Sequence, residues 1–190
     1  MKRRLCIFAS WLLAASTPLL ADVLSVQPAN PTETVGQTFT LSVDISATSD
    51  LYGYQFDLGF DPTVLEATSV AEGSFLGTGG PTIFIPGTID NIGGSITANA
   101  DILDGALSGV SGAGDLLDVT FQALATGSSP VQVFNVIALD SFGMGLDVAT
   151  SGSTVTVVPA TVPEPGAWLL LGSESALLLA FCLRRRVRRQ

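Results

Sequence analysis

Histidine is absent from this 190-residue sequence, and lysine and arginine occur only at its two ends. Between residues 22 and 162 there is no basic residue, whereas fifteen of the seventeen Asp and Glu residues lie there. Such a segment repels nucleic acid and anionic lipid, because they carry charge of the same sign. It also lacks the His or Cys that a Ser-His-Asp triad, a Cys-His pair or a common zinc site requires. These absences exclude nucleic-acid binding and argue against an enzyme.

Cysteine and tryptophan are also missing from the middle of the chain. Cys6 and Cys182, like Trp11 and Trp168, lie in the terminal segments. The middle segment therefore has no disulfide, and its hydrophobic core alone must stabilise it. About 140 residues are enough to bury such a core.

The N-terminal residues have the pattern of a secretory signal peptide. Basic residues at positions 2–4 are followed by an apolar run at 5–15 and by a segment rich in small residues at 16–21. This order is typical of a cleavable signal, and we predict cleavage after Ala21. A retained helical anchor is the alternative. The prediction is an exported protein whose mature chain begins at Asp22.

The C-terminal segment, residues 161–190, has the pattern of a membrane tail. After a Pro-containing break, residues 167–183 are apolar except for a Gly-Ser-Glu-Ser patch. A helix of that length reaches about 26 Å, near the lower limit for crossing a bilayer. A basic end at residues 184–190 stops translocation and sets the topology, with the preceding domain outside. Its arginines are Arg184, Arg185, Arg186, Arg188 and Arg189.

This tail resembles a PEP-CTERM sorting signal. The motif consists of Val162, Pro163, Glu164 and Pro165, followed by the apolar run and the arginines. The resemblance implies recognition by an exosortase, a membrane protease-transpeptidase that cuts near the motif and releases or re-attaches the protein. The chain would then be held transiently in the membrane through its C-terminal helix before it reaches the cell surface or extracellular matrix. A plain single-pass anchor is the alternative.

The middle of the chain has the alternating pattern of β-strands. Apolar and polar residues alternate in short runs separated by turn residues, and the runs lie at 39–45, 52–60, 82–85, 95–102, 116–124, 131–138 and 153–157. Clusters of Gly, Asn, Asp, Ser and Pro at 77–81, 91–95 and 109–114 supply turns. We predict an all-β domain over residues 22–160, a β-sandwich of about nine strands without helix, flanked by the signal helix and the transmembrane helix.

Residues 51–73 indicate which kind of sandwich this is. They contain an alternating strand, an Asp61-Pro62 turn, a second strand from Val64 and a final glycine. This stretch resembles the hallmark of the cohesin domain, a nine-stranded jelly-roll sandwich, and residues 114–124 are similar to a later strand of that family. Cohesins bind dockerin modules through one sheet face and are not catalytic. The Asn/Asp pair that many cohesins use for dockerin is absent from this strand.

The first strand of that hairpin also carries the candidate ligand-binding residues, Tyr52, Tyr54, Gln55 and Asp57. The parity of the strand places Gln55 and Asp57 on its solvent face, with Gly53 and Gly59. The two tyrosines share the other face, where they could stack against a sugar. Phe56, Leu58 and Phe60 continue their stripe with the same parity, so the alternative is that the tyrosines belong to the core.

Carboxylates are the remaining source of chemistry in the domain. Asp101 and Asp104, like Asp115 and Asp118, are close in sequence, but residues three apart on a strand point to opposite faces. We expect solvated surface carboxylates rather than the converging pair of a glycosidase. Calcium, which prefers oxygen ligands, is the one metal that suits this composition. However, the sequence has no Asp-x-Asp-x-Asp-Gly loop, and we predict no metal ligands and no cofactor.

These observations together predict an exported, non-enzymatic surface or matrix module that binds or scaffolds an unknown protein. A carbohydrate-binding module that retains exopolysaccharide at the cell surface is the alternative.

Overall fold

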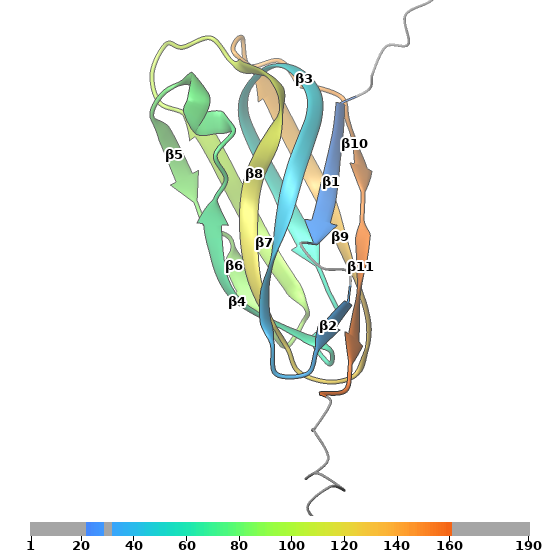
Figure 1. The fold of residues 1–190 in the computed structure, drawn as a ribbon. Helices are drawn as coiled ribbons and strands as arrows, with labels where there is room; N and C mark the ends of the chain where they lie inside the picture. The colour runs from blue at the N-terminus through green and yellow to red at the C-terminus, as the bar shows by residue number, and fades with distance from the viewer. Residues whose placement is uncertain (1–21, 29–31, 161–190) are drawn as a thin grey trace, which may run out of the picture.

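The structure, a computed structural model, describes residues 22–28 and 32–160, and the predicted signal peptide and sorting tail lie outside the described residues. This part of the chain forms strands throughout, with one short 3-10 helix, η1 (Figure 1). The elements are β1 (Asp22–Pro28), β2 (Thr32–Thr34), β3 (Thr38–Gly59), β4 (Leu65–Glu72), η1 (Leu76–Gly79), β5 (Thr82–Ile85), β6 (Thr88–Asp90), β7 (Ser95–Leu103), β8 (Val110–Ala123), β9 (Gly127–Asp140), β10 (Val148–Ser151) and β11 (Ser153–Val158).

Strand β3 joins the two layers of the sandwich. Its 22 residues would extend about 70 Å if they were straight, but the strand reverses direction between Ala47 and Asp50, which have φ values of +57° and +60°. The first half pairs with β1 and β8, and the second half pairs with β7 and β9. The reversal lies at the top of Figure 1. The two strands that we predicted at 39–45 and 52–60 are therefore two arms of one element.

Strand pairing gives each layer a simple order. The first layer runs β4–β8–β3–β1–β10. The second layer runs from β5 and β6 through β7, β3 and β9 to β11 and β2. The predicted all-β sandwich is confirmed. The number of strands exceeds the predicted nine because short edge strands such as β2, β6 and β10 are too brief to show an alternating pattern.

The core lies between the layers and is built from the predicted inward positions. Tyr54, Phe56 and Leu58 of β3 are all at most 5% exposed. Phe121 of β8 is fully buried, and its ring centroid lies 6.0 Å from that of Phe39 and 5.2 Å from that of Phe60. Phe39 and Phe121 are paired within the first layer, and Phe60, directly after β3, packs its ring against Phe121 from the second layer, which helps to hold the layers together.

Local turn chemistry fixes the hairpin between β3 and β4. The Asp61 carboxylate accepts hydrogen bonds from the backbone N–H of Thr63, at 2.9 Å, and from its hydroxyl, at 2.6 Å. This contact confirms the predicted Asp61-Pro62 turn. The predicted turn at 109–114 was wrong, because β8 begins at Val110 and Gly112 continues the strand with a φ of +129°. Within the described residues, the domain has no α-helix, as predicted, and η1 is a single 3-10 turn.

Among residues 22–28 and 32–160, no helix has the length and hydropathy that a membrane crossing requires.

Candidate docking site

A groove lined by aliphatic side chains runs across the outer face of the second layer. Ile83 and Ile85 of β5 form one wall, Ile137 and Leu139 of β9 form the other, and Ile102 of β7 lies between them. Ile83, Ile85 and Ile137 are each more than half exposed. Clustered exposed aliphatic side chains are unusual on a soluble domain and mark a surface that binds a partner.

Gly53 of β3 keeps the floor of this groove open. It pairs with Ile102 on one side and with Leu139 on the other. A Cβ atom at position 53 would lie 3.0 Å from Cγ1 of Ile102 and 3.1 Å from the carbonyl oxygen of Asp101. Any larger residue would therefore fill the space between the two neighbouring strands, and the groove would become shallower.

Asp57 fixes the middle of the same face. Its carboxylate accepts a hydrogen bond from the backbone N–H of Ala98 on β7 and another from the side-chain amide of Asn135 on β9, both at 2.7 Å. Ala98 and Asn135 have positive φ values, and the pairing register shifts beside each of them. Asp57 thus ties two bulges to the central strand. It lies on the outer face together with the exposed Gln55, as the parity of β3 predicts.

The two tyrosines that we considered for sugar stacking face elsewhere. Tyr54 is 5% exposed, and its hydroxyl donates to the carbonyl of Leu116. Burial, with the nearby carboxylates of Asp101 and Glu72, raises the pKa of Tyr54. The Tyr52 hydroxyl donates to the carbonyl of Gly105. Tyr54 therefore belongs to the core, which was the alternative to sugar stacking, and the hydroxyls of both tyrosines donate to backbone carbonyls.

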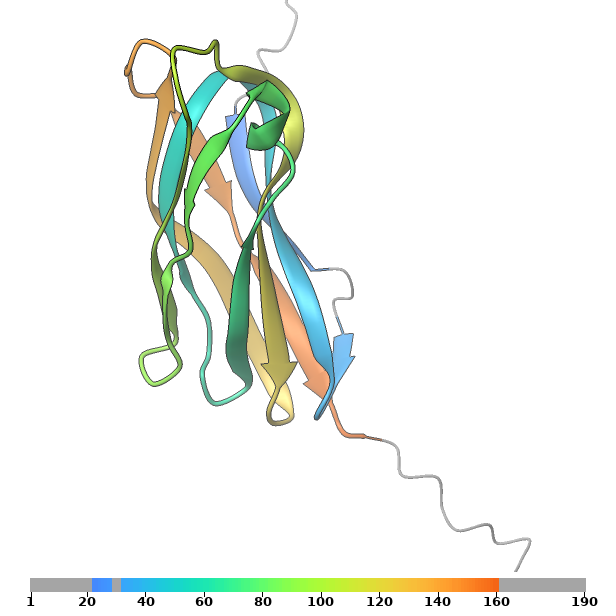
Figure 2. The same ribbon diagram turned by 90° about the vertical axis from the view of Figure 1, so that its left-hand side faces the viewer.

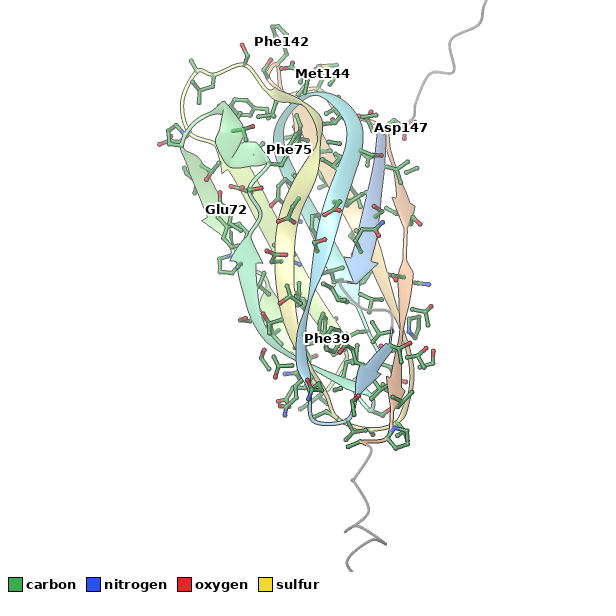
Figure 3. All side chains as sticks on the ribbon, in the orientation of Figure 1. Phe39, Glu72, Phe75, Phe142, Met144 and Asp147 are labelled. Atoms are coloured by element: carbon green, nitrogen blue, oxygen red, sulfur yellow. The ribbon has the colours of Figure 1, made fainter. Side chains whose placement is uncertain are left out.

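Phe134 is the exposed aromatic residue on this outer face. It is 41% exposed, and its ring lies beside Gly59, where an added Cβ would be 3.3 Å from the ring. With Gln132 and Pro130 it lines a second hollow, at the opposite end from the aliphatic groove. Phe142 and Met144 are also exposed, but they lie on the loop between β9 and β10 at the top of Figure 3.

One acidic pair behaves differently from our prediction. Asp115 and Asp118 were expected on opposite faces, but the register shift between Val43 and Asp44 places the buried Leu116 and Leu117 next to each other on β8. The bulge brings both carboxylates beside Asp44. Burial and the charges of Asp118 and Asp44 raise the pKa of Asp115 to about 6. The parity rule failed because it assumes an unbroken strand.

The other pair diverges as predicted, although not as two solvated groups. Asp104 is exposed, whereas Asp101 is only 2% exposed and points between the layers. In the part of the chain that the structure describes, no three Asp, Glu, His or Cys side chains gather closely enough to hold a metal ion.

Comparison with known proteins agrees with this architecture. The family model of the cohesin domain matches residues 24–158, which is most of the chain. This chain belongs to the cohesin family. Cohesin domains are non-catalytic scaffolding modules, so this domain is a protein-binding module rather than an enzyme. No curated protein sequence matches the chain.

Solved cohesin structures share the fold at low sequence identity. A non-cellulosomal cohesin from the archaeon Archaeoglobus fulgidus is 21% identical, with a TM-score of 0.58 over 73% of this chain and 91% of that one. The sixth cohesin of scaffoldin B from Acetivibrio cellulolyticus, solved in complex with a dockerin, is 17% identical, with a TM-score of 0.60 over 73% and 99%. The cohesin module of a family 33 glycoside hydrolase from Clostridium perfringens is 11% identical, with a TM-score of 0.58 over 73% and 99%. The last two solved chains consist almost wholly of this one module.

Sequence reasoning identified Gly53, Gln55 and Asp57 as outer-face residues but missed the aliphatic walls of the groove. A signal was present at residues 82–85, where Ile83 and Ile85 share one parity and the half-buried Phe84 has the other. A strand that is apolar on both faces either lies wholly inside a core or exposes an apolar face. As β5 is an edge strand of a single layer, its isoleucines face outward.

Proposed function

We propose that this cohesin is exported and displayed at the cell envelope or in the extracellular matrix, where it binds a protein partner through the aliphatic groove around Gly53. The observation that carries the proposal is the position of that groove. It spans four neighbouring strands of one sheet face, β5, β7, β3 and β9, which are held by backbone pairing, so a partner meets a preformed surface.

Charge suggests the chemistry of the partner. The domain has fifteen carboxylates and no basic side chain, so a protein with Lys or Arg around an aliphatic side chain is complementary to it. A related cohesin is solved in complex with a dockerin, which makes dockerin modules the first candidates. In this chain the outer-face positions of β3 beside the groove are Gly53 and Gln55 rather than an Asn/Asp pair. Aliphatic contact, rather than polar contact with these positions, would therefore supply most of the affinity.

A matched pair of substitutions tests the docking face. Ile137→Asp places a charge in the groove, whereas Ile92→Asp places the same charge on a turn residue that is 94% exposed and lies outside the groove. We expect dockerin modules from the same cell, assayed by biolayer interferometry at low salt, to bind the wild type and Ile92→Asp. The Ile137→Asp variant should bind at least tenfold more weakly, because a desolvated unpaired charge costs several kcal/mol. Equal affinity of all three proteins would exclude the groove.

Polysaccharide is the competing ligand for the same face. Exopolysaccharide from the same cell, tested in the same assay, should bind neither the wild type nor the variants. Binding that is lost in Phe134→Ala and retained in Ile137→Asp would favour the carbohydrate-binding alternative and overturn the protein-docking proposal. Phe134 is the residue to test, because its ring is 41% exposed on the outer face, whereas Tyr54 is buried and cannot present its ring to a sugar.

The delivery of the module is the second part of the proposal. It rests on the sequence of residues 161–190 and on its resemblance to a PEP-CTERM signal. Replacing Pro163, Glu164 and Pro165 by alanines should leave the protein in the membrane fraction and unprocessed, because the prolines keep the chain extended for a protease. Neutral residues at the arginine positions should instead disturb the topology. Immunoblots of membrane and medium separate the two outcomes, and normal processing of the triple-alanine variant would reduce the tail to a plain anchor.

A further inference from the structure

A buried carboxyl group lies directly behind the aliphatic groove. Asp101 is on β7, between Ala100 and Ile102, which line the groove, yet its own side chain points inward and is 2% exposed. One carboxylate oxygen, Oδ1, accepts a hydrogen bond from the backbone N–H of Ile102 at 2.8 Å. The other oxygen, Oδ2, is buried and has no donor among the described residues. An unpaired buried carboxylate oxygen is costly, so this group requires an explanation.

A second carboxyl group lies near Asp101. Glu72, at the end of β4, is close enough for its charge to raise the pKa of Asp101. Two carboxylates have only acceptor atoms, so they can form a hydrogen bond only when one of them carries a proton. Glu72 also accepts a hydrogen bond from the hydroxyl of Thr82, the first residue of β5. Thr82 has the same parity on β5 as Phe84, which pairs with Asp101 of β7, so the hydrogen bond to Thr82 holds Glu72 on the side of the strands to which Asp101 points.

These three residues connect the two layers at an open side of the sandwich. β4 belongs to the first layer and pairs only with β8, while β5 and β7 belong to the second layer. Figure 2 faces this side and shows β4 and β5 as separate ribbons with no strand between them, and Glu72 is labelled there in Figure 3. The carboxyl pair thus bridges a gap that backbone pairing leaves open.

We propose that the Asp101 carboxyl group holds a proton, donates it in a hydrogen bond to the Glu72 carboxylate, and so forms a latch that joins β4 to β5 and β7. When the proton is present, the latch holds β5, and with it the wall of the groove formed by Ile83 and Ile85. When the proton is lost, two carboxylates repel each other across the gap and β5 loosens. The latch itself does not depend on a partner, whereas its effect on binding rests on the proposed docking function.

The other charged and titratable groups around the pair are acidic or phenolic. Tyr54 of β3 has a raised pKa because of its burial and the charges of Asp101, Glu72 and Asp115. Neither η1 nor β5 carries a charged residue. No cation within the described part of the chain can neutralise the pair, since every basic residue lies at the ends of the sequence. Burial, and next the charge of Glu72, accordingly raise the pKa of Asp101 to about 6, within the range of natural environments.

Glu72→Gln tests the latch, and Glu66→Gln, the same change on the same strand, is the control. A glutamine at position 72 donates its amide to the Asp101 carboxylate without needing a proton, and residue 72 is exposed, so the variant should fold. The protein is the module of residues 22–160. The readouts are the melting temperature and amide hydrogen exchange of Thr82–Ile85, corrected for the intrinsic effect of pH, at pH 5 and pH 7.5.

In the wild type and in Glu66→Gln, we expect the protection of the β5 amides against hydrogen exchange to fall by up to about thirtyfold between pH 5 and pH 7.5. The reason is that Asp101, with a pKa of about 6, remains protonated in roughly one molecule in thirty at pH 7.5. Glu72→Gln should lose little of that protection and should melt at a higher temperature than the wild type at pH 7.5, but not at pH 5. A Glu72→Gln variant with the pH response of the wild type would overturn the latch.

Calcium provides the second decisive arm. If millimolar CaCl2 raised the melting temperature of the wild type at pH 7.5 but not that of Glu72→Gln, the pair would bind a cation rather than share a proton, and the proposal would be wrong. A pH response that survives in Glu66→Gln and vanishes in Glu72→Gln, with no effect of calcium, supports it. These outcomes do not depend on groove binding, so a failed docking experiment would leave the latch standing.

Discussion

Asn91 provides a sensitive test of how the two layers are joined. It lies in the turn between β6 and β7, and its side chain bonds to the backbone of Ala67 on β4 at both polar atoms. The Asn91 oxygen accepts from the Ala67 N–H at 2.9 Å, and the Asn91 amide donates to the Ala67 carbonyl at 3.0 Å. The amide thus occupies the place of one residue of a neighbouring strand on the free edge of β4.

Asn91→Ala removes both hydrogen bonds and leaves two backbone groups of a residue that is 3% exposed without partners. Each bond contributes about 1 kcal/mol and incomplete solvation adds to the loss, so we expect a decrease of about 2–3 kcal/mol in the free energy of unfolding. For a module of this size, that corresponds to a fall of about 6–12 °C in melting temperature.

The assay is thermal unfolding of residues 22–160 at pH 7, followed by circular dichroism. Ile92→Ala is the control, because Ile92 is in the same turn and 94% exposed, and it should melt within about 2 °C of the wild type. Asn91→Asp retains the acceptor but loses the donor, so its melting temperature should lie between the two. If Asn91→Ala melted with the wild type, the amide would not join the layers and the reasoning would be refuted.

Three further outcomes follow from the contacts described above. The folded state binds the proton of Asp115 more tightly than the unfolded state does, because the folded pKa is raised to about 6, so the protein loses stability as pH rises from about 4 to 6. In urea titrations, Asp115→Asn should therefore raise the free energy of unfolding by about 1 kcal/mol at pH 7.5, after solvent screening, and should leave it unchanged at pH 4. Tyr54→Phe leaves the buried carbonyl of Leu116 without its donor and should cost about 1–2 kcal/mol in the same titration. Secreted protein should begin at Asp22 in N-terminal sequencing, and a sequence that retained the basic residues 2–4 would contradict the signal peptide.

The strands and the core could be predicted because they depend on local pattern. Alternation identified the inward side of β3 from Tyr54 to Phe60, and the chemistry of Asp61 identified its turn. The reversal at Ala47–Asp50 could not be predicted, since two non-glycine residues adopt positive φ there and the apolar alternation continues up to the reversal. The bulge on β8 could not be predicted either, because Leu116 and Leu117 are both apolar, so the sequence does not show which of them takes the inward position of a regular strand.

The site was less accessible to sequence reasoning than the fold. Gln55 and Asp57 were assigned to the outer face by parity alone, but the groove needs side chains from β5, β7 and β9, which become neighbours only through long-range pairing. Asp101 was misjudged as a solvated carboxylate for the same reason. The prediction that Asp101 and Asp104 point in different directions was correct. Which of these two side chains is buried depends on the position of β4, and the residues around position 101 carry no information about that position.

The pairing of β11 with β9 determines how this module responds to mechanical force. If the chain is held beyond residue 160 and pulled through a partner in the groove, tension enters at β9 and leaves through β11, its antiparallel neighbour in the same sheet. β11 ends at the bottom of the sandwich in Figure 1 and lies along its long axis. The load is then parallel to the strands, so the hydrogen bonds between Ser153–Val157 and Gly127–Val131 are sheared together rather than opened one after another. A tether at this end lets the module bear traction without first peeling apart its two layers.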